Sequence, residues 1–197
     1  GALFDLTKLT DVSKNVISKM NAEKVLAYAL DWAKNYDEKL YSLLSKDEEY
    51  SKKIFSIDRG TAKPRKDISK FSEIGSYVSY FFDEEFKTDL SELPENLSKE
   101  TVKKVLEAYA STYEQAADNS EWFSHMKELC EPLGFTPNVK EYKKNPEQFL
   151  GHVGDVSTVV RVAVTGRKNT PDLFSIMTVL GKERVLERLN AAITALS

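Results

Sequence analysis

Apolar residues recur along this chain at intervals of three and four positions, the spacing of an amphipathic α-helix. Residues 21–36, 98–117 and 120–133 each place apolar side chains on one face. Ser98 can cap the second of these helices with its hydroxyl, and Gly134 follows the third, where glycine readily ends a helix. The apolar positions include Val25, Leu26, Ala29, Trp32, Val102, Val105, Leu106, Tyr109, Trp122, Met126, Leu129 and Cys130.

Two further segments extend this helical pattern. Residues 68–86 are rich in aromatic side chains, and we predict a helix for most of their length. Residues 156–164 are rich in valine and would suit a strand by propensity. Their length and the following Gly166 favour a helix, and no strand–turn–strand pattern recurs elsewhere. The sequence therefore predicts an all-α chain.

The chain is long enough for one large domain or two small ones, with 197 residues of which 41% are hydrophobic. The segment at residues 90–98 combines Pro94, Asn96 and two serines, which is typical of a domain boundary. We therefore predict two helical subdomains. Because the chain has one cysteine, Cys130, in an apolar helical context, we expect a reduced, buried thiol and no intrachain disulfide.

Charge is distributed unevenly over a chain whose net charge is −3. Residues 58–70 hold five cations against two acids, a local charge of +3. Residues 158–197 hold six cations against three acids, again +3, which leaves −9 for the remainder. Two basic regions on an acidic body can steer a polyanion to one face.

Other kinds of site have little support. His125 and His152 lack Cys, His or acidic partners at ligand spacing, so we expect no metal site. The aromatic residues are interpreted as core, with a base-stacking role for Tyr77 or Tyr80 as the alternative. The absence of a long apolar run and of a signal peptide predicts a cytoplasmic protein without a membrane segment. The start at Gly1, with no Met, suggests part of a longer protein.

A run of motifs near the C-terminus is the most specific feature. It reads Thr165-Gly166-Arg167, then Thr170-Pro171-Asp172-Leu173-Phe174, then Leu180-Gly181-Lys182-Glu183. Thr170 can cap a helix that has Pro171 at its first position. That helix start stands near Arg161, Arg167 and Lys168, which would suit an anion. A plain helix start without any ligand is the simpler interpretation.

These motifs resemble the C-terminal signature of bacterial glutamyl-tRNA synthetases, the class I glutamate–tRNA ligases. The segments FDLTKLTDVSK near the start and KPRKDISKF at residues 63–71 are similar to further stretches of the family. The resemblance implies an anticodon-binding helical bundle, of the α-helical cage type. It divides the chain into the end of a stem-contact region at 1–20, one anticodon-binding subdomain at 21–95 and a second at 96–197.

The resemblance also implies which residues bind tRNA. Arg65 matches the arginine that contacts the last anticodon base, a cytosine. Arg161 matches a basic position on the helix before the Thr165-Gly166-Arg167 motif, and Arg167 of that motif is a further candidate for tRNA contact. The segment that packs on the remaining anticodon bases is matched by Thr170, Pro171 and Leu173. The contacts to the tRNA backbone would come from Lys63, Lys66 and Lys168, although the family often has an apolar residue where Lys66 stands. Without the family, Arg65 would be an ordinary surface arginine. Even with it, Arg161 could pair with Asp155 or Glu183.

The implied function is recognition of the glutamate tRNA anticodon by a monomer. We find neither ATP-handling motif of class I synthetases, no Walker A loop and no dinucleotide fingerprint. We therefore expect no cofactor and no activity in this fragment, with ATP and Mg²⁺ used by a catalytic domain of the parent enzyme. The alternative is a helical protein-interaction module that does not bind RNA.

Overall fold

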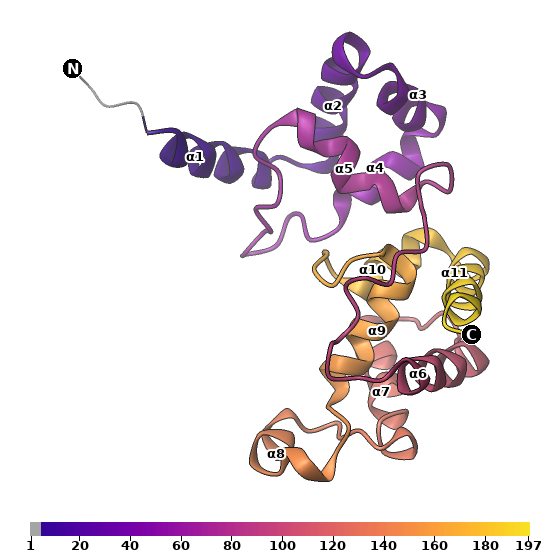
Figure 1. The fold of residues 1–197 in the computed structure, drawn as a ribbon. Coiled ribbons are helices and arrows are strands. Elements are labelled where there is room, and N and C mark those ends of the chain that lie inside the picture. Colours follow the sequence, from indigo (N-terminus) through magenta and orange to yellow (C-terminus); the bar gives the residue numbers. More distant parts are fainter. Residues whose placement is uncertain (1–4) are drawn as a thin grey trace. The chain divides into compact units, whose positions relative to one another are not determined.

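The computed structural model describes residues 5–197 of the chain, which form two compact units divided between Phe86 and Lys87 (Figure 1). The division lies between Phe86 and Lys87, whereas the sequence placed it near residues 90–98. Residues 5–20 of the region predicted at 1–20 are part of the first unit. Residues 1–4, with which that region and the FDLTKLTDVSK segment begin, lie outside the described residues.

The first unit is built around α2 (Ala22–Tyr36), which packs against α3 (Glu38–Lys46) and α4 (Glu48–Ser56). Asn21, Asp37 and Asp47 cap these three helices, because each side chain accepts a hydrogen bond from a backbone N–H of the first turn. α1 (Leu6–Ser18) precedes them. The predicted helix at 68–86 is shorter than expected and consists of η1 (Phe71–Glu73), α5 (Ile74–Val78) and η2 (Ser79–Phe81).

The second unit surrounds α9 (Val153–Thr165), which contacts α6 (Lys99–Thr112), α7 (Asn119–Glu128) and α11 (Lys182–Ala195). Figure 1 shows α9 running through the middle of this unit. The remaining elements are α10 (Leu173–Leu180), α8 (Val139–Lys144), η3 (Glu131–Leu133) and η4 (Pro146–Gln148).

The valine-rich segment is helical, as predicted, and it forms most of α9. Val156, Val159, Val160, Val162 and Val164 are all fully buried, so these residues fill a core that neighbouring helices close on several sides. Tertiary packing therefore overrides the preference of valine for strands. The helix ends at Gly166, whose φ of 72° lies in the left-handed region that glycine adopts most easily.

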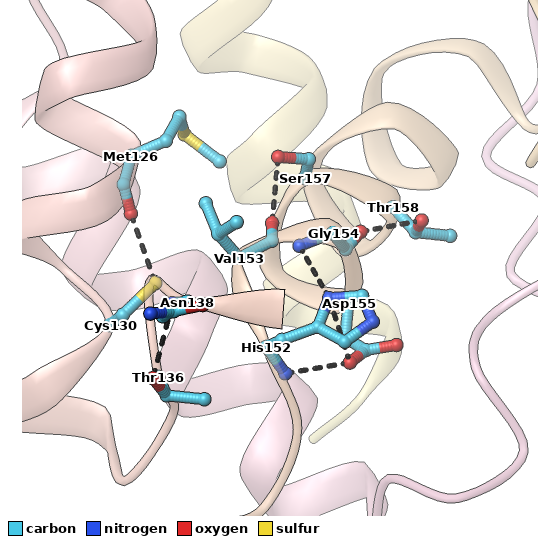
Figure 2. A network of polar contacts seen from close by, with 10 residues as sticks. All are labelled: Met126, Cys130, Thr136, Asn138, His152, Val153, Gly154, Asp155, Ser157 and Thr158. Carbon is cyan, nitrogen blue, oxygen red and sulfur yellow. Dashed lines mark hydrogen bonds and ion pairs between the residues drawn. The ribbon is translucent and has the colours of Figure 1, made fainter. Parts of the chain in front are cut away.

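The all-α prediction is confirmed over residues 5–197, where the only β-type pairing is an isolated bridge between Thr136 and His152. The bridge places His152 at the start of α9 (Figure 2). His152 Nδ1 accepts the Gly154 N–H at 2.9 Å, and the Asp155 carboxylate accepts the His152 N–H at 2.8 Å. This reciprocal capping gives His152 a structural role.

Cys130 is fully buried, as predicted, and its thiol donates a hydrogen bond to the Met126 carbonyl at 3.3 Å (Figure 2). Burial raises the pKa of this thiol to about 11. Within residues 5–197, no cluster of three His, Cys, Asp or Glu side chains could hold a metal ion. No helix in that range is long and apolar enough to cross a membrane.

Candidate nucleic-acid interface

The corner between α9 and α10 carries most of the predicted site residues. Gly166 turns the chain there, and a Cβ at this position would lie within 4 Å of Lys87 and Asp89. The Lys168 N–H donates to the Glu92 carboxylate at 2.7 Å. The corner is thus fixed against the first residues of its own unit. Lys168 itself is exposed, and Arg167 is half-buried.

Arg161 braces this corner from the middle of α9. Its Nη1 atom donates to the Thr170 hydroxyl and, at 2.9 Å, to the Pro171 carbonyl. Arg161 is half-buried, and it links α9 to Thr170 in the following loop, nine residues further along the chain. A planar group with several donors suits this task, because it satisfies two acceptors at once.

The start of α10 differs from the prediction. Thr170 was expected to cap the helix with Pro171 at its first position, but the helix begins at Leu173 and Asp172 caps it. The Asp172 carboxylate accepts the Ser175 N–H at 2.8 Å. A carboxylate is also favoured at the positive end of a helix, which explains why Asp172 takes the position. The Thr170 hydroxyl is instead held between Arg161 and the Pro171 carbonyl.

Burial separates the predicted contact residues into two groups. Thr170 is 6% exposed, Leu173 is 1% exposed and Pro171 is buried as well. These three residues therefore support the corner from within. Lys168 is exposed, and Arg161 and Arg167 are half-buried.

The second basic region is the loop at residues 57–70 in the first unit. Arg59 anchors its beginning, because its Nη1 donates to the carbonyls of Ile17 at 2.8 Å and Met20 at 3.4 Å, at the end of α1. Its end is held by the Ser13 hydroxyl, which donates to the Ser69 carbonyl. The loop is therefore fixed at both ends against the same helix.

Arg65 forms a bidentate ion pair inside this loop. Its Nε and Nη2 atoms lie 2.7 and 3.0 Å from the two carboxylate oxygens of Asp67. This pairing raises the pKa of Arg65, and its side chain remains 35% exposed. Arg65, Asp67 and Tyr77 line one small hollow. Burial raises the pKa of the Tyr77 phenol to about 12. Lys63 and Lys66 are exposed beside Arg65.

The charge count overstates the cationic surface of residues 158–197. Arg188 is 3% exposed, and its Nη1 donates to the Val164 carbonyl at 2.9 Å, at the end of α9. This role was not predicted. Its signal was available, because Arg188 shares the helical face of Val185, Leu189 and Ala192, which are all buried.

The interpretation of the aromatic residues as core holds for several of them. Trp122 is buried, and its indole N–H donates to the Tyr109 hydroxyl at 2.9 Å. Tyr80 is 3% exposed, which excludes it as a stacking platform in this structure. Trp32 and Tyr77 are only half-buried.

Comparisons with known proteins agree with the resemblance in the sequence. Residues 143–193, which include Arg161 and the whole α9–α10 corner, match the family model described as "Anticodon binding domain". The chain is 43% identical over 189 residues to a glutamate–tRNA ligase of Acetivibrio thermocellus, with 96% of this chain and 34% of that protein covered. It is 46% identical over 192 residues to one of Clostridium perfringens strain 13, with 96% and 35% covered.

A solved structure shows the same fold. The crystal structure of a glutamate tRNA ligase from Elizabethkingia meningosepticum, in complex with its amino acid, matches with a TM-score of 0.59 and 19% identity. The match covers 100% of this chain and 34% of that one. The chain thus spans about a third of the length of the relatives, and it matches their C-terminal part.

Proposed function

We propose that this chain, which corresponds to the C-terminal anticodon-binding region of glutamate–tRNA ligases, recognises the anticodon of a glutamate tRNA. The observation that carries the proposal is the anticodon-binding match at residues 143–193, together with identities above 40% to ligases over nearly the whole chain. The two basic regions give a physical reason, since a polyanion is attracted to clustered cations.

The parent protein would attach glutamate to that tRNA in the cytoplasm. The names of the relatives suggest this reaction. ATP and Mg²⁺ would act in a catalytic part that this chain does not match, so we expect no aminoacylation from this chain alone. Here the chain would act as a monomer and supply only recognition.

Arg65 is our candidate for reading the last anticodon base. A guanidinium offers a planar pair of donors that suits the acceptor edge of a cytosine, and bases in a loop are accessible at those edges. The bidentate pair with Asp67 shows that the side chain already presents such a pair of donors. Lys63, Lys66 and Lys168 are exposed and would contact phosphates, as would Arg167.

The buried corner residues suggest a refinement of the predicted contacts. Arg161, Thr170, Pro171 and Leu173 would shape the surface on which the remaining anticodon bases lie. A direct contact from Thr170 or Leu173 would require the corner to open, because both side chains are buried here.

The proposal is tested by titrating the chain with a glutamate tRNA and with a variant whose last anticodon base is changed. Because phosphate contacts release counterions, we expect weak binding whose log affinity falls with log salt concentration. No detectable binding at low salt would contradict the proposal, and so would tight binding that salt does not weaken.

Two substitutions then separate base readout from phosphate contact. We expect Arg65→Ala to cost on the order of 1–3 kcal/mol more against the cognate tRNA than against the changed one, by analogy with DNA base contacts. Lys66→Ala should weaken both tRNAs about equally, because an ammonium on a phosphate carries no sequence information. Equal losses for Arg65→Ala would make Arg65 a phosphate contact.

One observation favours the alternative of a protein-interaction module. Four apolar side chains of α1 are exposed, with Leu6 at 70%, Leu9 at 51%, Val12 at 52% and Val16 at 53%. An exposed apolar stripe of this kind marks interaction surfaces. Light scattering would decide whether this apolar stripe drives self-association. We expect the chain to be a monomer.

A further inference from the structure

Helix α2 carries a row of aromatic rings on its outer side. Tyr28, Trp32 and Tyr36 follow one another at four-residue intervals, so they share one side of the helix. The rings of Trp32 and Tyr36 lie 5.6 Å apart, and Tyr28 lies 5.7 Å from the ring of Phe71. We call these four residues the aromatic ladder.

The ladder lies outside the fully buried core of its unit. The buried face of α2 is supplied by other residues, namely Ala22, Val25, Leu26, Ala29 and Ala33. Tyr28 is 45% exposed and Tyr36 is 75% exposed. A group of large rings at the surface indicates an interaction site more often than a packing need.

The ladder adjoins the basic loop of the same unit. Phe71 directly follows Lys70, the last residue of the +3 segment at residues 58–70. The Nζ atom of Lys24 lies 6.0 Å from the centre of the Tyr28 ring. Arg59 and Ser13 fix the ends of the loop to α1, and Lys70, the neighbour of Phe71, is exposed.

We propose that unpaired nucleotides of the RNA stack on the aromatic ladder while Lys24 and Lys70 contact their phosphates. Any base has an apolar face that lies well on a tyrosine or tryptophan ring, and neighbouring cations hold the backbone. The excess of positive charge in the adjacent loop favours a polyanion over an uncharged apolar partner. The inference rests on the proposed function, and it adds to anticodon recognition a stacking contact that does not depend on which base is bound.

The test compares ring removal with ring retention. Tyr28→Leu and Tyr36→Leu remove rings, Tyr28→Phe keeps one, and Phe123→Leu removes a ring that lies beside Lys127 in the other unit. Each variant is titrated with an anticodon stem–loop RNA of the glutamate tRNA and with a fully paired RNA duplex of equal length. Circular dichroism checks that each variant is folded.

We expect each ladder leucine variant to weaken stem–loop binding by about fivefold or more, the lower end for loss of one stacked base. Tyr28→Phe and Phe123→Leu should bind as the unsubstituted chain does, and duplex binding should hardly change. Trp32 fluorescence should be quenched by the stem–loop, and the quenching should vanish in Trp32→Phe, because Trp122 is buried.

Two failures can be told apart. If the unsubstituted chain binds neither tRNA nor stem–loop at low salt, the proposed function fails and this inference fails with it. If the chain binds the stem–loop but the ladder leucine variants bind equally well and Trp32 is not quenched, only the inference is overturned.

Discussion

The guanidinium of Arg188 is almost completely buried on the Val164 carbonyl, whereas that of Arg65 reaches the surface and pairs with Asp67. Arg161 stands between these cases, half-buried against Thr170 and Pro171. A residue type that looks like a nucleic-acid ligand in the sequence therefore has at least two structural uses here. Donor geometry and burial decide the use, because the charge is the same in each case.

We predict that Arg161→Lys destabilises the chain even without RNA. A lysine places a single ammonium where the guanidinium spans two acceptors, and a poorly satisfied buried acceptor costs about 1–3 kcal/mol. The measurement is the free energy of unfolding in urea. Lys168→Met is the matched control, because Lys168 is exposed and should change stability by less than about 0.5 kcal/mol. Equal stability of Arg161→Lys and the unsubstituted chain would contradict a structural role for Arg161.

A second prediction concerns alkaline pH. Burial raises the pKa of the Cys130 thiol from 9.0 to about 11, so the folded chain holds a proton that the unfolded chain releases earlier. The stability that this gives is complete below pH 9 and is lost as pH rises towards 11. Urea midpoints measured from pH 8 to pH 11 should fall, and they should fall less in Cys130→Ala. Parallel curves for the two proteins would contradict this assignment.

At the scale of single elements, capping residues define where helices begin. Asp5, Asn21, Asp37, Asp47, Ser98, Asp118, Asn138, His152 and Asp172 each accept a backbone N–H of the following first turn. Most of these are the residue types that the sequence leads one to expect. His152 is the exception, and it uses a ring nitrogen for the purpose.

We predict that His152→Ala lowers the free energy of unfolding by about 1 kcal/mol, the usual cost of losing a cap. His152→Asn should retain most of the stability, because an amide oxygen can accept the Gly154 N–H in place of Nδ1. Thermal unfolding of the three proteins at one pH gives the comparison. A loss in His152→Asn as large as in His152→Ala would mean that ring contacts, such as that with Tyr142, matter more than the cap.

The sequence predicts the elements better than their ends and their surroundings. Amphipathic spacing and Ser98 located the start of α6, which ends at Thr112 and not near residue 117, and Gly166 located the end of α9. At α10 both Thr170 and Asp172 could cap, and only the position of Arg161 in space shows why Thr170 is used elsewhere. The burial of Arg188 likewise depends on the end of α9, which is distant in sequence. Local patterns carry no information about such long-range partners.

On the scale of the whole molecule, each unit has its own core. Leu44, Phe55 and Phe81 are buried in the first unit, and Tyr109, Val159 and Leu189 in the second. Lys87 stands at the junction and is exposed. Compact units with separate cores can fold independently.

We therefore predict that residues 87–197 fold without residues 1–86. Brief trypsin treatment should cleave at Lys87 early and leave two resistant fragments, and the separate fragment 87–197 should show a helical circular dichroism spectrum and cooperative unfolding. The control is Lys87→Gln, in which this early cleavage should disappear. A fragment without cooperative unfolding would show that the second core depends on the first unit.

The pair between Arg65 and Asp67 has a consequence for selectivity. Asp67 already binds the Nε and Nη2 donors of Arg65 with its two oxygens, so a base that approaches this edge of the guanidinium has to compete with the carboxylate. A base edge that offers only one acceptor would bind Arg65 less strongly than the carboxylate it has to displace, so that base would be rejected. The Asp67 carboxylate thus acts as an internal competitor, and only a base that binds Arg65 more strongly than the carboxylate displaces it. Relieving the competition with Asp67→Asn should make binding tighter and, at the same time, less discriminating.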